Sequence, residues 1–288
     1  MPHQLIFTSA PSGLNPGSGG YCTVAKSEGF PEDLTSDLEA SSTYDFGSKS
    51  LIGQRSPEVY RYQFYRTSSA TYFVLSIIKD VGFDHTGRTN YLAQHLVLTS
   101  ADIQALNSLD PKFNPATILL SKETALWREH WESNPEILAP ISIQDIYGYC
   151  RKVCPDDYRA SKWEEYSGNP ARAVALLSSL HSSYFSLAIE AGHERYLIEC
   201  LLETLNLASI QNEAWQYTFT TCLQKKENHE SYTWAFMSGE VLESFYHSKQ
   251  TEIQTWNTFE FSNLDQDLVY YAENGVARPI EPEQPVAP

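Results

Sequence analysis

A cluster of polar residues that could perform acid–base chemistry stands in the middle of the chain, in the run DHTGRTNYLAQH. It contains Asp84, His85, Arg88, Asn90 and His95. An aspartate can orient a histidine as an acid–base pair, an arginine can clamp a carboxylate or phosphate, and a second histidine on the following strand can face the same cleft. The cluster therefore predicts His85, His95 and Asp84 as candidate catalytic residues. A structural role stays open, because His95 stands in an apolar run and can be a satisfied buried histidine.

A glycine-rich loop near the N-terminus, in SGLNPGSGGYC, is the second feature. Four glycines between two strand-like runs indicate a tight, exposed connection or a docking surface. The loop lacks the G-x-x-x-x-G-K-[ST] spacing of a phosphate-binding loop, and no lysine follows Gly20. A structural turn or a backbone anion cradle remains open. The binding or interaction residues that we expect are Gly13, Ser18, Gly19, Gly20, Arg88 and Asn90.

Other nucleophiles and possible ligands give weaker patterns. Ser9 and Cys22 could act as nucleophiles only if folding brings a base to them. Cys150 and Cys154 lack a second pair or histidines at zinc spacing, and their separation of four residues is typical of core positions on a helix. We expect no metal site and no cofactor.

The charge balance narrows the classes of partner. The chain of 288 residues carries 36 acidic and 20 basic side chains, a net charge of −16. Such a surface repels phosphate backbones and anionic lipids, so we expect neither nucleic acid nor membrane as a partner. Residues 227–288 hold 11 of the acidic side chains against two basic ones, an acidic face that could meet a basic partner or simply keep the protein soluble.

Compartment can be inferred from cysteine usage and hydropathy. Five scattered cysteines form an odd set, unlike the dense even framework of a small secreted module. No run approaches the roughly 20 apolar residues of a membrane span. The sequence therefore predicts a cytoplasmic location.

The elements that must position the polar cluster are strands. Residues 59–66 alternate apolar and polar, and residues 71–81 form a longer aromatic and β-branched run, which together predict a hairpin. A second hairpin is expected around the glycine-rich loop. Short helices are expected from residue 34 and after Ser100, and a further strand over 114–120.

The pattern changes in the second half of the chain. A strand-like YFSLAIE is followed by the strongly helical ERYLIECLLETLNLA and then by WQYTFTTCL and YTWAFM, which predict a strand–helix–strand crossover with an appended hairpin. The fold class is therefore α+β, with a mixed β-rich N-terminal part and a C-terminal α/β layer. We expect domains at 1–140 and 141–262, and an acidic, Pro-rich tail or linker at 263–288.

Three ordered motifs, TSAPSGLNPGSGGYCTVAKSEGFP, TGRTNYLAQHLVL and WQYTFTTCL, resemble the N-terminal region of the bacterial GTPase-associated protein one family, second domain type. The resemblance spans about residues 4 to 225. The positions that fit its pattern are Gly13, Gly19, Gly20, Arg88, Asn90, His95 and Thr218 to Thr221. It carries over no catalytic residue set.

The resemblance implies a non-catalytic adaptor or scaffold in a bacterial NTP-dependent conflict system that resists phage, coupling a partner GTPase or AAA+ ATPase to an effector. Longer relatives continue into further domains, so the chain can be an N-terminal part. Two alternatives remain from the residues: a hydrolase that uses His85 or His95 with Asp84, and a small-anion sensor that uses the same loops. On the adaptor hypothesis we expect no turnover by the chain itself.

Overall fold

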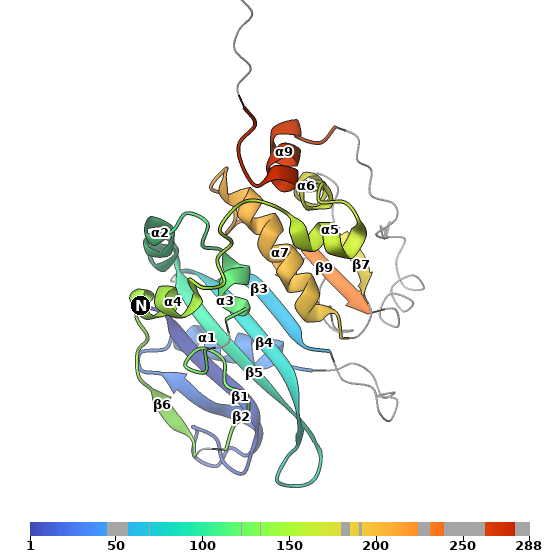
Figure 1. Ribbon diagram of the computed structural model, residues 1–288. Helices are drawn as coiled ribbons and strands as arrows, with labels where there is room; N and C mark the ends of the chain where they lie inside the picture. Colours follow the sequence, from blue (N-terminus) through green and yellow to red (C-terminus); the bar gives the residue numbers. More distant parts are fainter. Residues whose placement is uncertain are drawn as a thin grey trace, which may run out of the picture.

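The computed structural model describes residues 1–44, 57–68, 70–121, 123–132, 134–179, 185–189, 192–223, 231–238 and 263–279 (Figure 1). The described strands form one nine-stranded mixed sheet in the order β6-β2-β1-β5-β4-β3-β8-β9-β7. Helices cover the sheet, and the predicted α+β class is confirmed.

The N-terminal strands form the antiparallel part of the sheet. They are β1 (His3–Ala10), β2 (Gly20–Ser27), β3 (Val59–Arg66), β4 (Thr71–Phe83) and β5 (Thr89–Thr99). Both predicted hairpins are present, since β1 pairs with β2 and β3 with β4. The strand β1 also pairs with β5, so the loops after β1 and β4 emerge at the same end of the sheet. The short edge strand β6 (Glu136–Leu138) runs parallel to β2.

The C-terminal strands extend the same sheet. The predicted crossover is present as β7 (Phe185–Ile189), α7 (Glu194–Ser209), β8 (Phe219–Thr220) and β9 (Trp234–Ser238). The appended hairpin is wrong, because β8 and β9 pair in parallel. Only Phe219 and Thr220 of the expected strand WQYTFTTCL are in the ladder, where they also pair with β3.

The two faces of the sheet carry unequal layers. Helix α1 (Glu32–Ser41) covers one face, and it lies behind the sheet in Figure 1. The helices on the other face are α2 (Ser100–Leu109), α3 (Pro115–Leu119), α4 (Ile143–Cys150), α5 (Ser161–Ser167), α6 (Arg172–Ser178) and α7. Their buried side chains form the larger core, in which Leu75 of β4 and Trp163 of α5 belong to one cluster.

The sheet runs through both expected domains, 1–140 and 141–262. Because one sheet and one hydrophobic core contain residues from both ranges, the two ranges are joined in the folded chain. Whether either folds separately stays a prediction. The expected tail at 263–288 begins with helix α9 (Gln266–Asn274), whose Leu268 and Ala272 are buried. Residues 280–288 and most of the acidic residues of 227–288 lie outside the described residues.

The expected strand over 114–120 is wrong. The residues form α3, in which the Asn114 carboxamide accepts hydrogen bonds from the backbone N–H groups of Ala116 and Thr117 at 3.0 and 3.3 Å. Pro115 occupies the first helical position, where its missing N–H costs nothing. This cap outweighs the strand preference of the β-branched Thr117 and Ile118.

Candidate functional site

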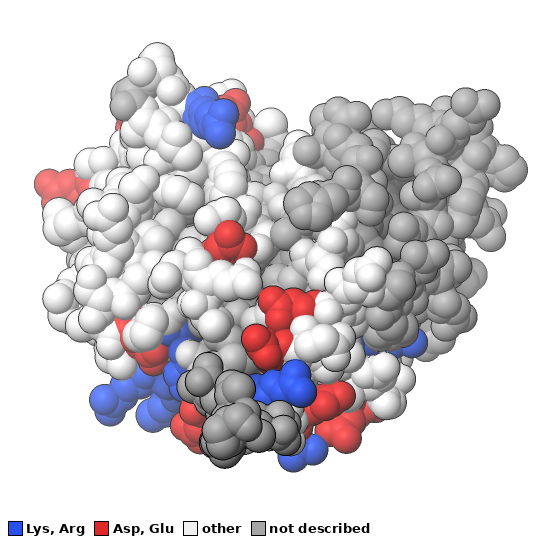
Figure 2. Space-filling model, turned by 90° about the horizontal axis from the view of Figure 1, so that it is seen from above, with Lys and Arg blue, Asp and Glu red and all other residues white. Residues whose placement is uncertain are grey.

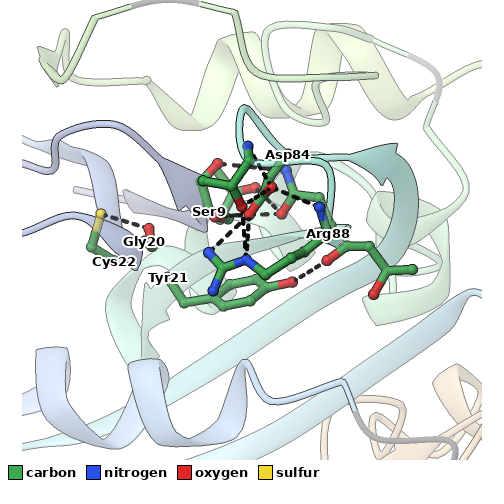
Figure 3. A network of polar contacts seen from close by, with 10 residues as sticks. Ser9, Gly20, Tyr21, Cys22, Asp84 and Arg88 are labelled. Carbon is green, nitrogen blue, oxygen red and sulfur yellow. Dashed lines mark hydrogen bonds and ion pairs between the residues drawn. The ribbon is translucent and has the colours of Figure 1, made fainter. Parts of the chain in front are cut away.

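The two sequence motifs meet at one end of the sheet (Figure 3). The Ser9 hydroxyl at the end of β1 donates to Asp84 Oδ2 at 2.8 Å, and the Asn90 side-chain oxygen accepts from the Ser9 N–H at 3.1 Å. The Tyr21 hydroxyl donates to the Thr89 carbonyl at 2.8 Å. The glycine-rich loop and the TGRTN loop are therefore held together as one surface, which we call the loop end: residues 9–21 and 83–90.

Asp84 fixes the turn between β4 and β5. Its Oδ1 accepts from the Thr86 N–H, the Thr86 hydroxyl and the Arg88 N–H at 2.8, 2.6 and 3.0 Å. Its Oδ2 accepts from Ser9 and from two nitrogens of Arg88, Nε at 3.2 Å and Nη2 at 3.0 Å. The Thr86 hydroxyl, helped by the other donors, lowers the pKa of the Asp84 carboxyl, although burial alone would raise it. An ionised carboxylate with six donors is a structural anchor and a poor general base.

The other two polar residues of this turn, Arg88 and His85, differ in whether they bond to Asp84. Arg88 is 63% exposed and forms the ion pair with Asp84. His85 is exposed, and among the described residues no hydrogen bond joins it to Asp84. The structure therefore brings Asp84 to Ser9 and Arg88, and does not form an Asp84–His85 pair.

The glycine-rich loop is closed by its own backbone bonds. Gly13 N–H donates to the Ser18 carbonyl at 3.1 Å, and the Ser18 N–H and hydroxyl both donate to the Asn15 carbonyl. Gly20 has φ +74°, and a Cβ on Gly13 would lie 2.5 Å from Ser18 Oγ. The conformation of Gly20 thus requires glycine, and a side chain at Gly13 would force Ser18 and Cys22 to shift.

His95 lies away from the loop end, inside β5 on the α1 side. The Ser76 hydroxyl lies 2.7 Å from its Nδ1, and Ser42 Oγ lies 2.8 Å from its Nε2. Ser42 already donates its one hydroxyl proton to the Leu38 carbonyl, so it accepts from His95 Nε2–H and Ser76 donates to Nδ1. Burial, with a smaller contribution from the Arg61 charge, lowers the pKa of His95 to about 3. The ring is therefore neutral and fully satisfied inside the protein.

Burial and backbone pairing, not a site, account for the cysteines and for Thr218–Thr221. Burial raises the pKa of Cys22 and also that of Cys150, to about 12, so both thiols are protonated. The backbone of Thr218 and Thr221 bonds to β9 and β3 neighbours. No group of three His, Cys, Asp or Glu side chains that could hold a metal occurs in the described part of the chain.

A hollow of about 280 Å³ opens beside the loop end. Its walls come from the end of β1, the β4–β5 turn and the segment before β6, and they include Ser9, Pro11, Phe83, His85, Trp131 and Glu132. Of the candidate residues from the sequence, Asp84, His85 and Asn90 line it, while the four glycine-loop positions, Arg88 and His95 do not. We call this the loop-end hollow.

Sequence reasoning misses four residues that line the hollow: Trp131, Glu132, Asn134 and Pro135. They reach the loop end because β6, which follows them, pairs in parallel with β2. A signal exists in HWESNP, where one tryptophan stands among polar residues and the turn-forming Asn134-Pro135 follows.

The described helices include none that is both long and apolar enough for a membrane crossing.

Comparison with known proteins gives one family. Residues 1–142 match the family model of GTPase-associated protein 1, N-terminal domain type 2. The resemblance found in the sequence is confirmed over this part of the chain, and the WQYTFTTCL motif lies beyond it. Neither the curated proteins nor the solved structures contain a significant match.

Proposed function

We propose that the chain is a non-catalytic adaptor of a bacterial NTP-dependent conflict system, in which it couples a partner GTPase or AAA+ ATPase to an effector. The name of the family that matches residues 1–142 associates the domain with a GTPase. The chain contributes a fixed surface in this proposal, and the partner contributes nucleotide hydrolysis.

The hydrogen bonding of the loop end supports a docking role. Asp84 uses both carboxylate oxygens to hold Ser9, Thr86 and Arg88, and the glycine-rich loop is closed by bonds of its own. A surface that is already ordered loses little conformational entropy when a partner binds, which favours affinity. The same bonds occupy the Asp84 carboxylate, which an acid–base pair with His85 would need.

The observation that carries the proposal is an exposed aromatic side chain on this fixed surface. Phe83 is 75% exposed at the last position of β4, and the turn that follows it is anchored by Asp84. Tyr21, 39% exposed, lies nearby because its hydroxyl bonds to Thr89, the strand partner of Phe83. Aromatic side chains on a rigid support are typical anchors of protein interfaces.

Association with the NTPase tests the proposal. The full chain is mixed with the GTPase or ATPase encoded beside it, and binding is measured by co-purification and calorimetry with and without nucleotide. We expect association at micromolar concentration or tighter. Phe83→Ser should weaken it by about tenfold, as loss of one anchor does. Leu109→Ser is the matched control, since Leu109 is 44% exposed at the end of α2.

Two results would contradict the proposal. One is no association with either the NTPase or an effector at micromolar concentration. The other is turnover by the chain alone that Asp84→Asn or His85→Ala abolishes while the fold is retained, which would support the hydrolase alternative.

A further inference from the structure

We infer that the loop-end hollow receives an arginine side chain of the protein partner. The inference rests on the proposed function, and it names the chemistry of the partner that the adaptor would recognise. It goes beyond that function because it assigns a ligand class to a place in the fold.

The charge of the walls excludes one class of ligand. None of the described residues that line the hollow is a lysine or an arginine, and the two charged side chains among them are Asp84 and Glu132. A phosphate or carboxylate would meet no cation there. At about 280 Å³ the hollow stands at the small end of ligand pockets, which span roughly 300–1,000 Å³. A single cationic side chain suits both its charge and its size.

The carboxylates at and beside the hollow differ in their ion pairing within the chain. Asp84, Glu129 and Glu136 each have a basic partner within 3.0 Å, namely Arg88, Lys79 and Arg128. Among the described residues, Glu132 has no Lys or Arg partner, and its carboxylate lies 3.7 Å from Nε2 of His130. Glu132 is therefore the carboxylate at the hollow that is left for a charge from outside.

The aromatic walls favour a guanidinium. Trp131 already binds one within the chain, since the Arg128 guanidinium lies 4.9 Å from its ring centroid. Phe83 and His85 present further rings. Planar guanidinium groups stack on aromatic faces and donate to a carboxylate at the same time, which a lysine ammonium does less well. Because both nearby arginines are ion-paired, their charges are largely compensated for an incoming cation.

The test uses the full chain labelled with ¹⁵N and two peptides, acetyl-Gly-Gly-Arg-Gly-Gly-amide and its citrulline counterpart, which keeps the shape and removes the charge. The readout is the indole N–H resonance of Trp131, identified as the one lost in Trp131→Phe. We expect the arginine peptide to shift it with millimolar affinity and the citrulline peptide to bind at least about fivefold more weakly. Glu132→Gln should weaken the arginine peptide by a similar factor.

Glu129→Gln is the matched control, since it removes the same charge three positions away and outside the hollow; it should leave binding unchanged. The inference is overturned if the two peptides bind equally, if the arginine peptide leaves the Trp131 resonance unmoved at about 10 mM, roughly tenfold above the expected dissociation constant, or if a glutamate peptide binds better. If the NTPase binds but ignores Glu132→Gln and the peptides fail, only this inference is lost. If the arginine peptide binds and no NTPase does, the proposed function is lost instead.

Discussion

The loop end and the centre of β5 each hold a titratable side chain in a hydrogen-bond network, but the side chain is charged in the first and neutral in the second. At the loop end, Asp84 stays ionised beside the exposed Arg88. In the centre of β5, His95 stays neutral between two serine hydroxyls and is 1% exposed. Neither side chain is open to water, since that of Asp84 is 0% exposed, so the hydrogen-bond donors and charges around each group decide its charge state. The first network orders a surface, and the second holds α1 against the sheet.

Charge elsewhere on the protein is mixed. Viewed from the end opposite the loop end, acidic and basic side chains lie close together along the lower edge, and a broad part of the described surface carries no charge (Figure 2). That face therefore shows no field of one sign. This contrast makes the loop end, where Glu132 has no Lys or Arg partner among the described residues, the more specific candidate for recognition by charge.

The largest expected effect comes from breaking the buried network. His95→Ala removes two hydrogen bonds, leaves the buried Ser76 hydroxyl without its acceptor and creates a cavity. We therefore expect the free energy of unfolding to fall by about 3 kcal/mol. His85→Ala, the matched control on the exposed loop, should change it by less than about 0.5 kcal/mol. Urea unfolding measures both. Equal effects would remove the distinction between the two histidines.

Acid should weaken the same network. The folded-state pKa of His95 is lowered to about 3, whereas the unfolded chain titrates near 6.5. The neutral ring stabilises the fold fully above pH 6.5, and this contribution is lost as the pH falls toward 3. Between pH 7 and pH 5 the wild type should lose about 2 kcal/mol more than His95→Gln.

The contribution of Asp84 to stability should be lost over a lower pH range than that of His95. The pKa of Asp84 is also lowered, so its contribution is present above the usual aspartate range and is lost only as the pH falls below about 4. Urea unfolding at pH 7, 5 and 3.5 separates the two groups. A steep loss between pH 7 and 5 that persists in His95→Gln would contradict the assignment.

Asp84→Asn should loosen the loop end with a smaller loss of stability than His95→Ala. The amide cannot accept all six bonds, so the backbone N–H groups of Thr86 and Arg88 should exchange with deuterium faster. Ser9→Ala removes one donor and should have a weaker effect on the same amides. Unchanged exchange in Asp84→Asn would show that the turn does not depend on the carboxylate.

The smallest expected effect concerns the glycine-rich loop. Gly20 has φ +74°, so Gly20→Ala should destabilise the protein by about 1 kcal/mol. Gly148 lies inside α4 with open space around it, and Gly148→Ala should stabilise by about 0.5–1 kcal/mol. Thermal unfolding of both variants checks the opposite signs, and a stabilising Gly20→Ala would be inconsistent with a backbone that requires glycine.

The sequence predicts the local elements better than their partners. The strands β3, β4 and β5 show alternation or long β-branched runs, and α7 has a continuous apolar stripe, so each is visible without a structure. The direction in which β8 pairs with β9 is not visible, because it depends on contacts with β3 that are remote in sequence. The same holds for α3, where one capping residue overrode strand preference.

The sequence indicates some residues of the loop end but not how they are bonded. The polar residues of the β4–β5 turn were found by type, but their bonding to Ser9 depends on the pairing of β1 with β5. Trp131 and Glu132 are not visible as site residues in the sequence, because contacts remote in sequence bring them to the loop end: β6 pairs with β2, and the Gln94 side chain bonds the Arg128 backbone. The short spacing between Asp84 and His95 favours one cluster, but the length of β5 separates the two side chains.

The most direct test of the docking account is hydrogen–deuterium exchange of the full chain with and without the neighbouring NTPase. The account predicts slower exchange at residues 10–20 and 83–90, where the amides of Gly13 and Thr86 report, and no change around Ser76 and His95, which are already buried. Binding that leaves the loop end unchanged and slows exchange elsewhere would contradict it.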